Sequence, residues 1–312
     1  MSEDAVSPVV AAMLILAVVV TFFAAWNAYY VPAMKAQSEI DHISKVESGF
    51  SRFSGDLLSA ISLRQDITLS ETIPLGGGDF TFDPVKSGGE LKVWSAASDA
   101  YLQANWTYRT GPELGSPTAP SPDYNSSLVK FSYTPTNNFW QGQGYVWSFG
   151  NLFVNNTERN LIAPLNKASM DDIGFDDLAG SFIVFEPSVY TSSAGCSVIT
   201  IRTVNITPEP RYDRVSGNGN SMLVLKSRIH RQPPVYNVTG ISMSVPRPEL
   251  IGGFRETLWE NLNSSAQEIR TSCTNIESLE TNDDQRWLRL KITPASNTTL
   301  LWVTNDITVG AH

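Results

Sequence analysis

The chain has 312 residues, enough for one large domain or two ordinary ones. Charged residues make up 17% of the chain, against about 25% in an average soluble domain. The chain has 22 Lys and Arg and 31 Asp and Glu, and the resulting net charge of −9 argues against a nucleic-acid partner. Its two Cys and three His leave few residues from which to build a zinc site, a redox centre or a histidine-dependent active site.

The first element in chain order is an uncharged segment over residues 5–34. Its central part, 9–25, holds Ala, Val, Leu, Ile, Met and Phe, with Thr21 as its polar residue. As a helix, the segment would span about 45 Å, against roughly 30 Å of bilayer hydrocarbon. A cleaved secretory signal is not expected, because the apolar run is too long and follows Glu3 and Asp4 instead of basic residues. The segment therefore predicts a membrane-spanning helix.

The two ends of this segment carry residues that suit helix and membrane boundaries. Ser7-Pro8 is a favourable helix start, since Ser can cap and Pro has no N–H to leave unpaired. Trp26, Tyr29 and Tyr30 cluster where the helix would leave the hydrocarbon. Pro32 removes one backbone hydrogen bond, so we expect a kink or a short unwound stretch there.

Residues 35–70 continue the helix as an amphipathic segment. Apolar residues recur at steps of three or four, the pattern of one helical stripe, and polar residues such as Glu39 and Lys45 fill the other positions. The pattern predicts a helix from Pro8 to about Leu63 whose second half packs on its own head. The stripe consists of Ile40, Ile43, Val46, Phe50, Phe53, Leu57 and Ile61.

The start of the chain resembles a known family. The hexapeptide Ala5-Val6-Ser7-Pro8-Val9-Val10, followed by an apolar helix, resembles the amino terminus of archaeal type IV pilins. The resemblance implies that a prepilin peptidase removes residues 1–4 as a leader by cutting between Asp4 and Ala5. It also implies that the helix lies in membrane lipid before assembly and then packs against the helices of other copies or other pilins in a filament core.

Small residues mark one face of the apolar helix and predict a packing seam between chains. Small side chains let helices approach closely in an apolar setting, where packing drives association. The alternative is an Ala-rich membrane helix with no particular seam. The residues, spaced by four, three and four, are Ala17, Thr21, Ala24 and Ala28.

Residues 71–312 are predicted to form a β-rich head, in which the run Gly76-Gly77-Gly78 precedes the strands. The expected fold class is therefore α+β. Alternation of apolar and polar residues is clearest in Val129–Tyr133 and Leu288–Ile292. The many short strands predict a β-sandwich or two packed sheets. A further helix is expected between Glu249 and Glu260. The other predicted strands are Tyr145–Phe149, Phe182–Phe185, Val198–Ile206, Met222–Leu225, Val235–Val245 and Thr299–Val309.

Two segments of the head are rich in turn residues. Thr110–Asp123 contains four prolines and is expected to be an exposed loop without regular structure, with a boundary between two lobes as the alternative. The sequence Ser-Gly-Asn-Gly-Asn at 216–220 lacks the Lys and the flanking elements of a phosphate-binding loop. It is expected to be a hairpin turn between Val204–Ile206 and Met222–Leu225.

Two features place the head outside the cell. Cys196 and Cys273 are the two cysteines, and we expect them to form a disulfide, which persists in oxidising compartments; the alternative is two unrelated buried thiols. Sequons for N-glycosylation occur in mild excess over chance. Their asparagines are Asn105, Asn125, Asn155, Asn205, Asn237, Asn263 and Asn297.

Candidate chemistry in the head is sparse. Asp171-Asp172 and Asp176-Asp177 could hold calcium, but an acidic surface loop is the preferred interpretation, and no metal or other cofactor is expected. Trp residues in β-rich heads mostly lie in the core; Trp140 is the best candidate to contact a surface glycan or cell-wall ligand. No catalytic constellation is recognisable.

The favoured function is structural. We expect a single-pass membrane protein that assembles through its apolar helix into a surface filament, as a major or minor subunit, with the head outside. The alternative is a non-polymerising, membrane-anchored adhesin or cell-wall-binding module. An exported enzyme is disfavoured.

Overall fold

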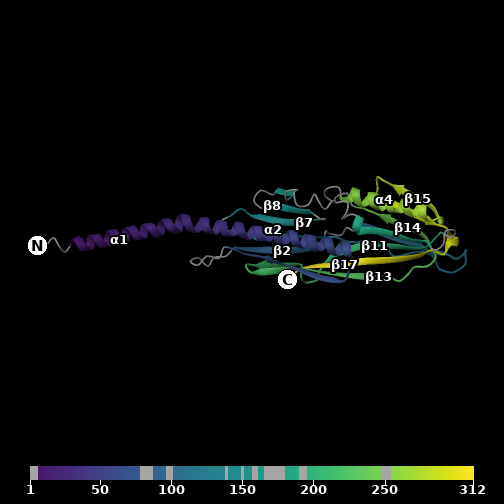
Figure 1. The fold of residues 1–312 in the computed structure, drawn as a ribbon, viewed down its shortest axis with the longest axis horizontal. Helices are drawn as coiled ribbons and strands as arrows, with labels where there is room; N and C mark the ends of the chain where they lie inside the picture. Colours follow the sequence, from purple (N-terminus) through teal and green to yellow (C-terminus); the bar gives the residue numbers. More distant parts are fainter. Residues whose placement is uncertain are drawn as a thin grey trace.

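A long helix projects from an elongated, strand-rich head (Figure 1). A computed structural model describes residues 6–77, 87–95, 101–137, 140–148, 151–156, 161–164, 180–189, 195–246 and 254–312. The helix begins with α1 (Val6–Ala25), passes through a π-helical turn, η2 (Trp26–Tyr30), and continues as α2 (Val31–Leu63). Together with the strands that follow, it confirms the α+β class. The predicted sandwich packing stays a prediction.

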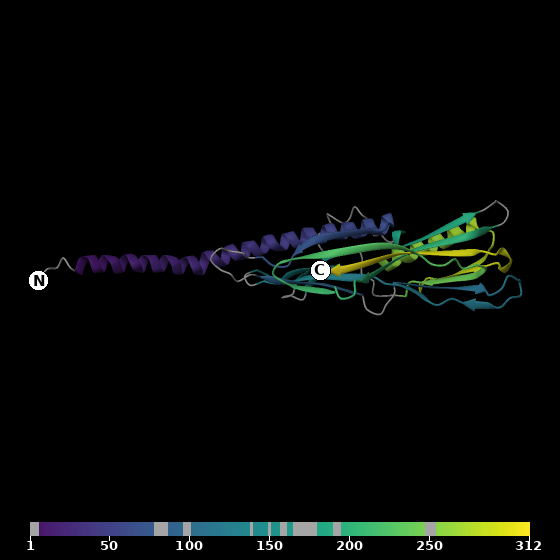
Figure 2. The same cartoon turned by 90° about the horizontal axis from the view of Figure 1, so that it is seen from below.

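The helix runs without a break to the end that its apolar stripe predicts. α1 and α2 meet at a shallow bend near η2, and α2 then lies along the head (Figures 1 and 2). Leu63 is the last helical residue, and Arg64 follows in the left-handed conformation with φ 48°. Within the segment 35–70, the helix extends to Leu63 and the first strand begins at Ile67.

The longest strands belong to a five-stranded sheet that extends through the head. β11 and β17 pair in parallel, whereas the other neighbours pair antiparallel. α2 contacts β1 and β13 of this sheet. Its strand order is β1 (Ile67–Pro74), β13 (Asn220–Arg231), β17 (Thr299–Ala311), β11 (Cys196–Pro208) and β10 (Ile183–Val189).

A second sheet, all antiparallel, lies beside α2 (Figure 1). Its β6 contains the predicted strand Val129–Tyr133, and its β7 carries the buried Tyr145 and Trp147 on one face, as expected. Phe149 lies outside the described residues. The order is β12 (Arg214–Gly217), β2 (Gly88–Ser95), β6 (Val129–Thr136), β7 (Gln143–Ser148), β8 (Asn151–Asn156) and β9 (Leu161–Pro164).

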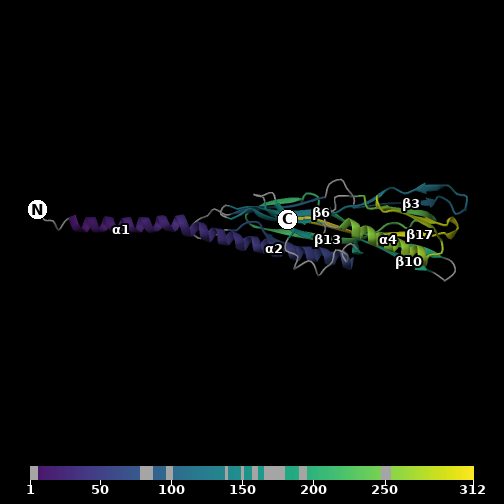
Figure 3. The ribbon, with the colours of Figure 1, turned by 90° about the horizontal axis from the view of Figure 1, so that it is seen from above.

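A third antiparallel sheet occupies the end of the head away from α1 (Figure 3). Its β16 contains Leu288–Ile292, and buried and exposed residues alternate along it as predicted. β5 (Tyr124–Ser126) pairs with β3 off the main path. The order is β15 (Ile276–Asn282), β16 (Trp287–Ile292), β14 (Val238–Ser244), β3 (Leu102–Arg109) and β4 (Thr118–Pro120).

Three local predictions for the head need correction. The second helix, α4, is described over Phe254–Ser272, well past the expected end at Glu260, while 247–253 lie outside the described residues. The segment Thr110–Asp123 was predicted to have no regular structure, but it contains the short strand β4, which pairs with β3 despite the prolines. The segment 216–220 is not a hairpin turn, since it joins β12 to β13, and these strands pair in different sheets. A short 3-10 turn, η5 (Pro294–Ser296), precedes β17.

Candidate assembly helix and its junction with the head

The most conspicuous surface of the molecule is α1. Every residue from Pro8 to Ala25 is exposed, and large side chains such as Val18 and Met13 keep 68% and 65% of their surface uncovered. This helix is long and apolar enough to cross a membrane. Apolar surface of this extent is unfavourable in water, so α1 requires lipid or other protein around it.

The four predicted seam residues are all exposed, three of them on α1 and the fourth, Ala28, just beyond it. Thr21 Oγ1 donates to the Ala17 carbonyl at 2.7 Å, so its hydroxyl is satisfied within the helix and needs no polar partner outside. Ala17, Thr21 and Ala24 share one face of α1, and Ala28 follows inside η2. Packing of these residues against another chain stays a prediction.

Pro32 acts on the helix through η2. Proline has no N–H and clashes with the preceding turn, and the strain is absorbed as a π-helical turn in which the Val31 N–H reaches Trp26 O. Of the two expected disturbances, the helix shows the bend, at a widened turn, and it is not unwound (Figure 1). Trp26 and Tyr30 stack with ring centroids 4.8 Å apart, forming an aromatic pair where the apolar segment ends.

In α2 the predicted apolar stripe meets the head. Six of its seven members, from Ile43 to Ile61, are buried, and Ile40 is half-buried. Phe50 and Phe53 contact Phe131 of β6, with centroid distances of 5.4 and 5.3 Å. Gly49 sits so close to β1 that an added Cβ would lie 2.6 Å from Ile73, which lets helix and strand approach. The prediction that α2 packs on its own head is confirmed.

The sequence did not reveal that polar residues of α2 are buried in this junction as well. Glu39 is 1% exposed and accepts the Trp140 backbone N–H at 2.7 Å. The half-buried Glu47 accepts from Tyr145 Oη at 2.7 Å, and the buried Ser54 Oγ accepts from Trp147 Nε1 at 2.9 Å. Buried polar groups need partners, and these contacts fix how α2 is rotated and where it lies along the sheet.

His42 is the titratable group at this junction. It lies 2.8 Å from Tyr133 Oη, which donates its proton to the Leu75 carbonyl at 2.9 Å. The phenol has one proton, so His42 Nε2–H is the donor to Tyr133. Burial, followed by the charge of Lys45, lowers the pKa of His42, and the nearby Glu39 opposes this shift. The junction therefore favours a neutral imidazole.

The last turn of α2 is held by the five-stranded sheet. Asn305 Nδ2 donates to the Ala60 carbonyl at 3.0 Å, and its Oδ1 accepts from Ser227 Oγ at 2.7 Å. Ser227 Oγ also lies 2.8 Å from the Gln65 carbonyl. The Ala60 carbonyl also accepts from the Arg64 N–H at 3.2 Å, so Asn305 adds a second donor at the helix end, and Ser227 engages the connection between α2 and β1.

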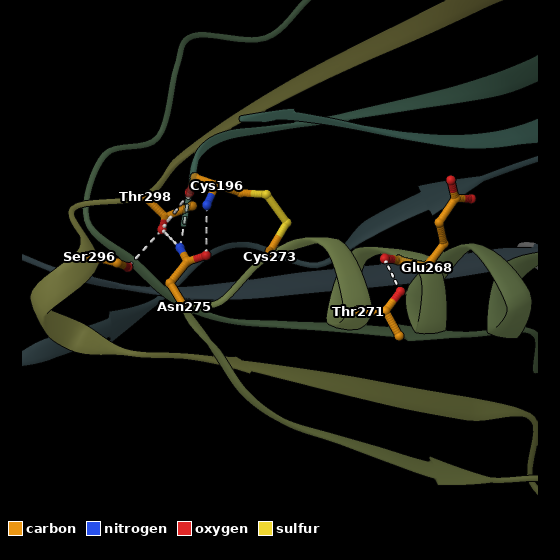
Figure 4. The surroundings of a disulfide bond; sticks show 7 residues. All are labelled: Cys196, Glu268, Thr271, Cys273, Asn275, Ser296 and Thr298. Atoms are coloured by element: carbon orange, nitrogen blue, oxygen red, sulfur yellow. Dashed lines mark hydrogen bonds between the residues drawn. A yellow bond between two sulfur atoms is a disulfide. The ribbon is translucent and has the colours of Figure 1, made fainter. Parts of the chain in front are cut away.

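The two cysteines lie at disulfide distance, as expected (Figure 4). Cys196 begins β11 and Cys273 follows α4, with 5.1 Å between their Cα atoms. Asn275 braces the site by bonding the Cys196 N–H and carbonyl at 2.8 and 2.9 Å and Thr298 Oγ1 at 2.7 Å. The bridge links α4 to the parallel strand pair.

The seven sequons differ in their surroundings. Asn105, Asn125 and Asn297 are exposed. Asn205 is the least suited to carry a glycan, because its Nδ2 donates to Asp306 and its Oδ1 accepts from the Ser127 N–H. Modification of these asparagines stays a prediction. The remaining three, all half-buried, are Asn155, Asn237 and Asn263.

The other candidate residues contribute no constellation. Asp171, Asp172, Asp176 and Asp177, like Asp4 and Ala5, lie outside the described residues. Within the described ranges, no group of three His, Cys, Asp or Glu could hold a metal ion. Trp140 is 39% exposed, but its backbone is engaged by Glu39 at the α2 junction.

Comparison with known proteins gives no relative. No family model matches the chain, and neither the curated proteins nor the solved structures contain a match.

Proposed function

We propose that this chain is a structural subunit of a surface filament of the archaeal type IV pilin kind, inserted in the membrane through α1 before it assembles. The observation that carries the proposal is the contrast within one helix, where α2 is covered by the head and Pro8–Ala25 is exposed throughout. In this role prepilin peptidase would cut between Asp4 and Ala5. Neighbouring helices would then replace lipid around α1.

Length supports the membrane stage of this proposal. Residues 6–30 are helical, which gives about 37 Å, enough to cross roughly 30 Å of hydrocarbon. The first charged residue after this segment, Lys35, is already 2% exposed within the head. The head would therefore lie directly against the outer interface, with the Trp26–Tyr30 pair at the boundary.

Three features support an external head. The cysteine pair at disulfide distance suits an oxidising compartment, and three sequons present exposed asparagines. A β-sandwich architecture, which the strand-rich head suggests, is common among cell-surface domains. The proposal assigns the head a structural or adhesive role and no catalysis.

The alternative is a membrane-anchored adhesin that never polymerises, for which an exposed α1 would simply be a lipid anchor. The mature amino terminus separates the two. Purification from cells that contain prepilin peptidase, followed by mass spectrometry, should show a chain that begins at Ala5 if the protein is processed as a pilin. A chain that still carries residues 1–4 would contradict processing and favour the tether.

A further inference from the structure

A cleft of about 530 Å³ opens beside β3 of the third sheet. Figure 3 shows β3 in the part of the head away from α1. One wall is formed by β3, through Trp106 and Tyr108, and the other by the segment 232–237 between β13 and β14. Its volume lies within the range of roughly 300–1,000 Å³ that is typical of sites for small ligands. The cleft is distinct from the α2 junction and from α1.

The cleft presents flat apolar surfaces. Trp106 is held against the buried Trp302, with stacked rings whose centroids are 5.3 Å apart. Tyr236 is 63% exposed, and Pro233-Pro234 beside it is exposed as well. A flat, partly apolar partner can bind favourably here, because it buries the exposed aromatic ring and the prolines. These side chains are rigid, so their ordering costs little conformational entropy.

The polar residues that line the cleft are mostly uncharged and include two amides, Gln232 and Asn237, and two hydroxyls, Thr110 and Ser121. The side chains of Gln232 and Asn237 line it, and neither amide is hydrogen-bonded within the described part of the chain. An amide offers both donors and acceptors. Arg109, the one charged residue among those lining the cleft, is 3% exposed and directs its guanidinium at the carbonyl of Glu113 and at Asn297 Oδ1. The lining therefore favours an uncharged ligand.

Backbone hydrogen bonds hold the wall 232–237 in place. Gln232 N–H donates to the Trp302 carbonyl at 2.9 Å, and Val235 exchanges two bonds with Leu300 at 3.0 and 2.8 Å. The Asn237 carbonyl accepts from the Arg109 N–H at 3.0 Å, while Asn237 itself has φ 57°. The cleft is thus formed before any ligand arrives, which lowers the entropic cost of binding.

From this geometry we infer that the cleft binds a neutral glycan. Sugar rings have apolar C–H faces that suit Trp106 and Tyr236, and hydroxyls that both donate and accept, as the amides of Gln232 and Asn237 require. A proline-rich peptide would also cover aromatic rings, but its backbone offers mainly acceptors. The one cation in the lining, Arg109, is 3% exposed and is already bonded to Glu113 and Asn297, which disfavours an acidic glycan. The inference holds whether α1 lies in lipid or in a filament core.

The test uses the full chain in detergent, made in a host without N-glycosylation because Asn237 begins a sequon. An array of neutral hexose and N-acetylhexosamine oligosaccharides is screened beside sialylated and sulfated glycans and a proline-rich peptide, and hits are titrated by calorimetry. We expect a neutral oligosaccharide to bind. Tyr236→Ala should weaken it about tenfold, as expected for one lost stacked ring, and Gln232→Ala should weaken it less.

Tyr212→Ala is the matched control, since it removes a tyrosine ring that is 44% exposed and lies outside the lining of the cleft, and it should leave glycan affinity unchanged. Thermal unfolding at the wild-type temperature shows that each variant is folded. Absence of any neutral glycan ligand, binding of acidic glycans or the peptide alone, or a Tyr236→Ala variant with unchanged affinity would overturn the inference.

Discussion

α1 and α2 form one continuous helix, yet α1 is exposed at every position from Pro8 to Ala25, whereas α2 buries twelve residues in the head. The sequence pattern differs in the same way. α2 has one apolar stripe with polar residues between, which suits one covered face, whereas α1 is apolar all round, which suits full coverage. The head covers α2, whereas none of the residues that the structure describes covers α1, which points to cover from outside the chain.

The largest expected change in the free energy of unfolding distinguishes a phenylalanine in α2 from one in α1. Phe50 is fully buried against Phe131, and Phe50→Ala should destabilise the head by about 3–5 kcal/mol, because a cavity replaces the ring. Phe22 is 62% exposed, and Phe22→Ala is the control that should leave head stability unchanged. Denaturant unfolding in detergent, followed by Trp fluorescence, measures both. Equal losses for the two variants would contradict the division of the helix.

A somewhat smaller loss of stability is expected when the disulfide is removed. The disulfide links α4 to β11 and does not involve α2. The double variant Cys196→Ser, Cys273→Ser should lose roughly 2–5 kcal/mol, since the bridge closes a loop between residues 77 apart in sequence. Thiol titration of the unreduced, denatured wild-type chain should find no reactive thiol. Two thiols per chain would refute the bond and weaken the external placement of the head.

The smallest effect is a pH dependence at the α2 junction. The pKa of His42 is lowered in the folded protein, mainly by burial, so the unfolded chain takes up a proton first as pH falls. The contribution of His42 is therefore complete above its unfolded pKa of about 6.5 and is lost as pH falls toward the folded pKa. The unfolding free energy of wild type should drop more between pH 7 and 5.5 than that of His42→Gln.

His230→Gln, which removes an exposed imidazole, is the matched control for this series and should behave as wild type. Identical pH slopes in the wild type and in His42→Gln would show that the neutral imidazole of His42 contributes nothing to the junction.

Local periodicity made the helix and several strands predictable. The stripe from Ile40 to Ile61 gave the face that packs and the end at Leu63, and alternation gave β6 and β16. The burial of Glu39 and His42 was not predictable, because each depends on partners about 90–100 residues away, such as Tyr133 and Trp140.

Sheet partners were the other part that the sequence could not supply. The turn residues at 216–220 are compatible with a hairpin, but β12 pairs with β2 and β13 with β1, so the chain crosses between sheets there. The cleft also depends on strand pairing that the local sequence does not indicate. Trp106 and Tyr236 are brought together by pairing of β3 with β14, and no local pattern marks them.

The central claim is that other copies of the chain cover α1, and interchain cross-linking in whole cells tests it most directly. Ala17→Cys lies on the small-residue face, Ile15→Cys on the opposite face, and Leu114→Cys on an exposed loop of the head serves as control. We predict ladders of cross-linked multimers for Ala17→Cys, fewer for Ile15→Cys and none for Leu114→Cys. Monomers alone at both α1 positions, in a processed and membrane-inserted chain, would contradict the account.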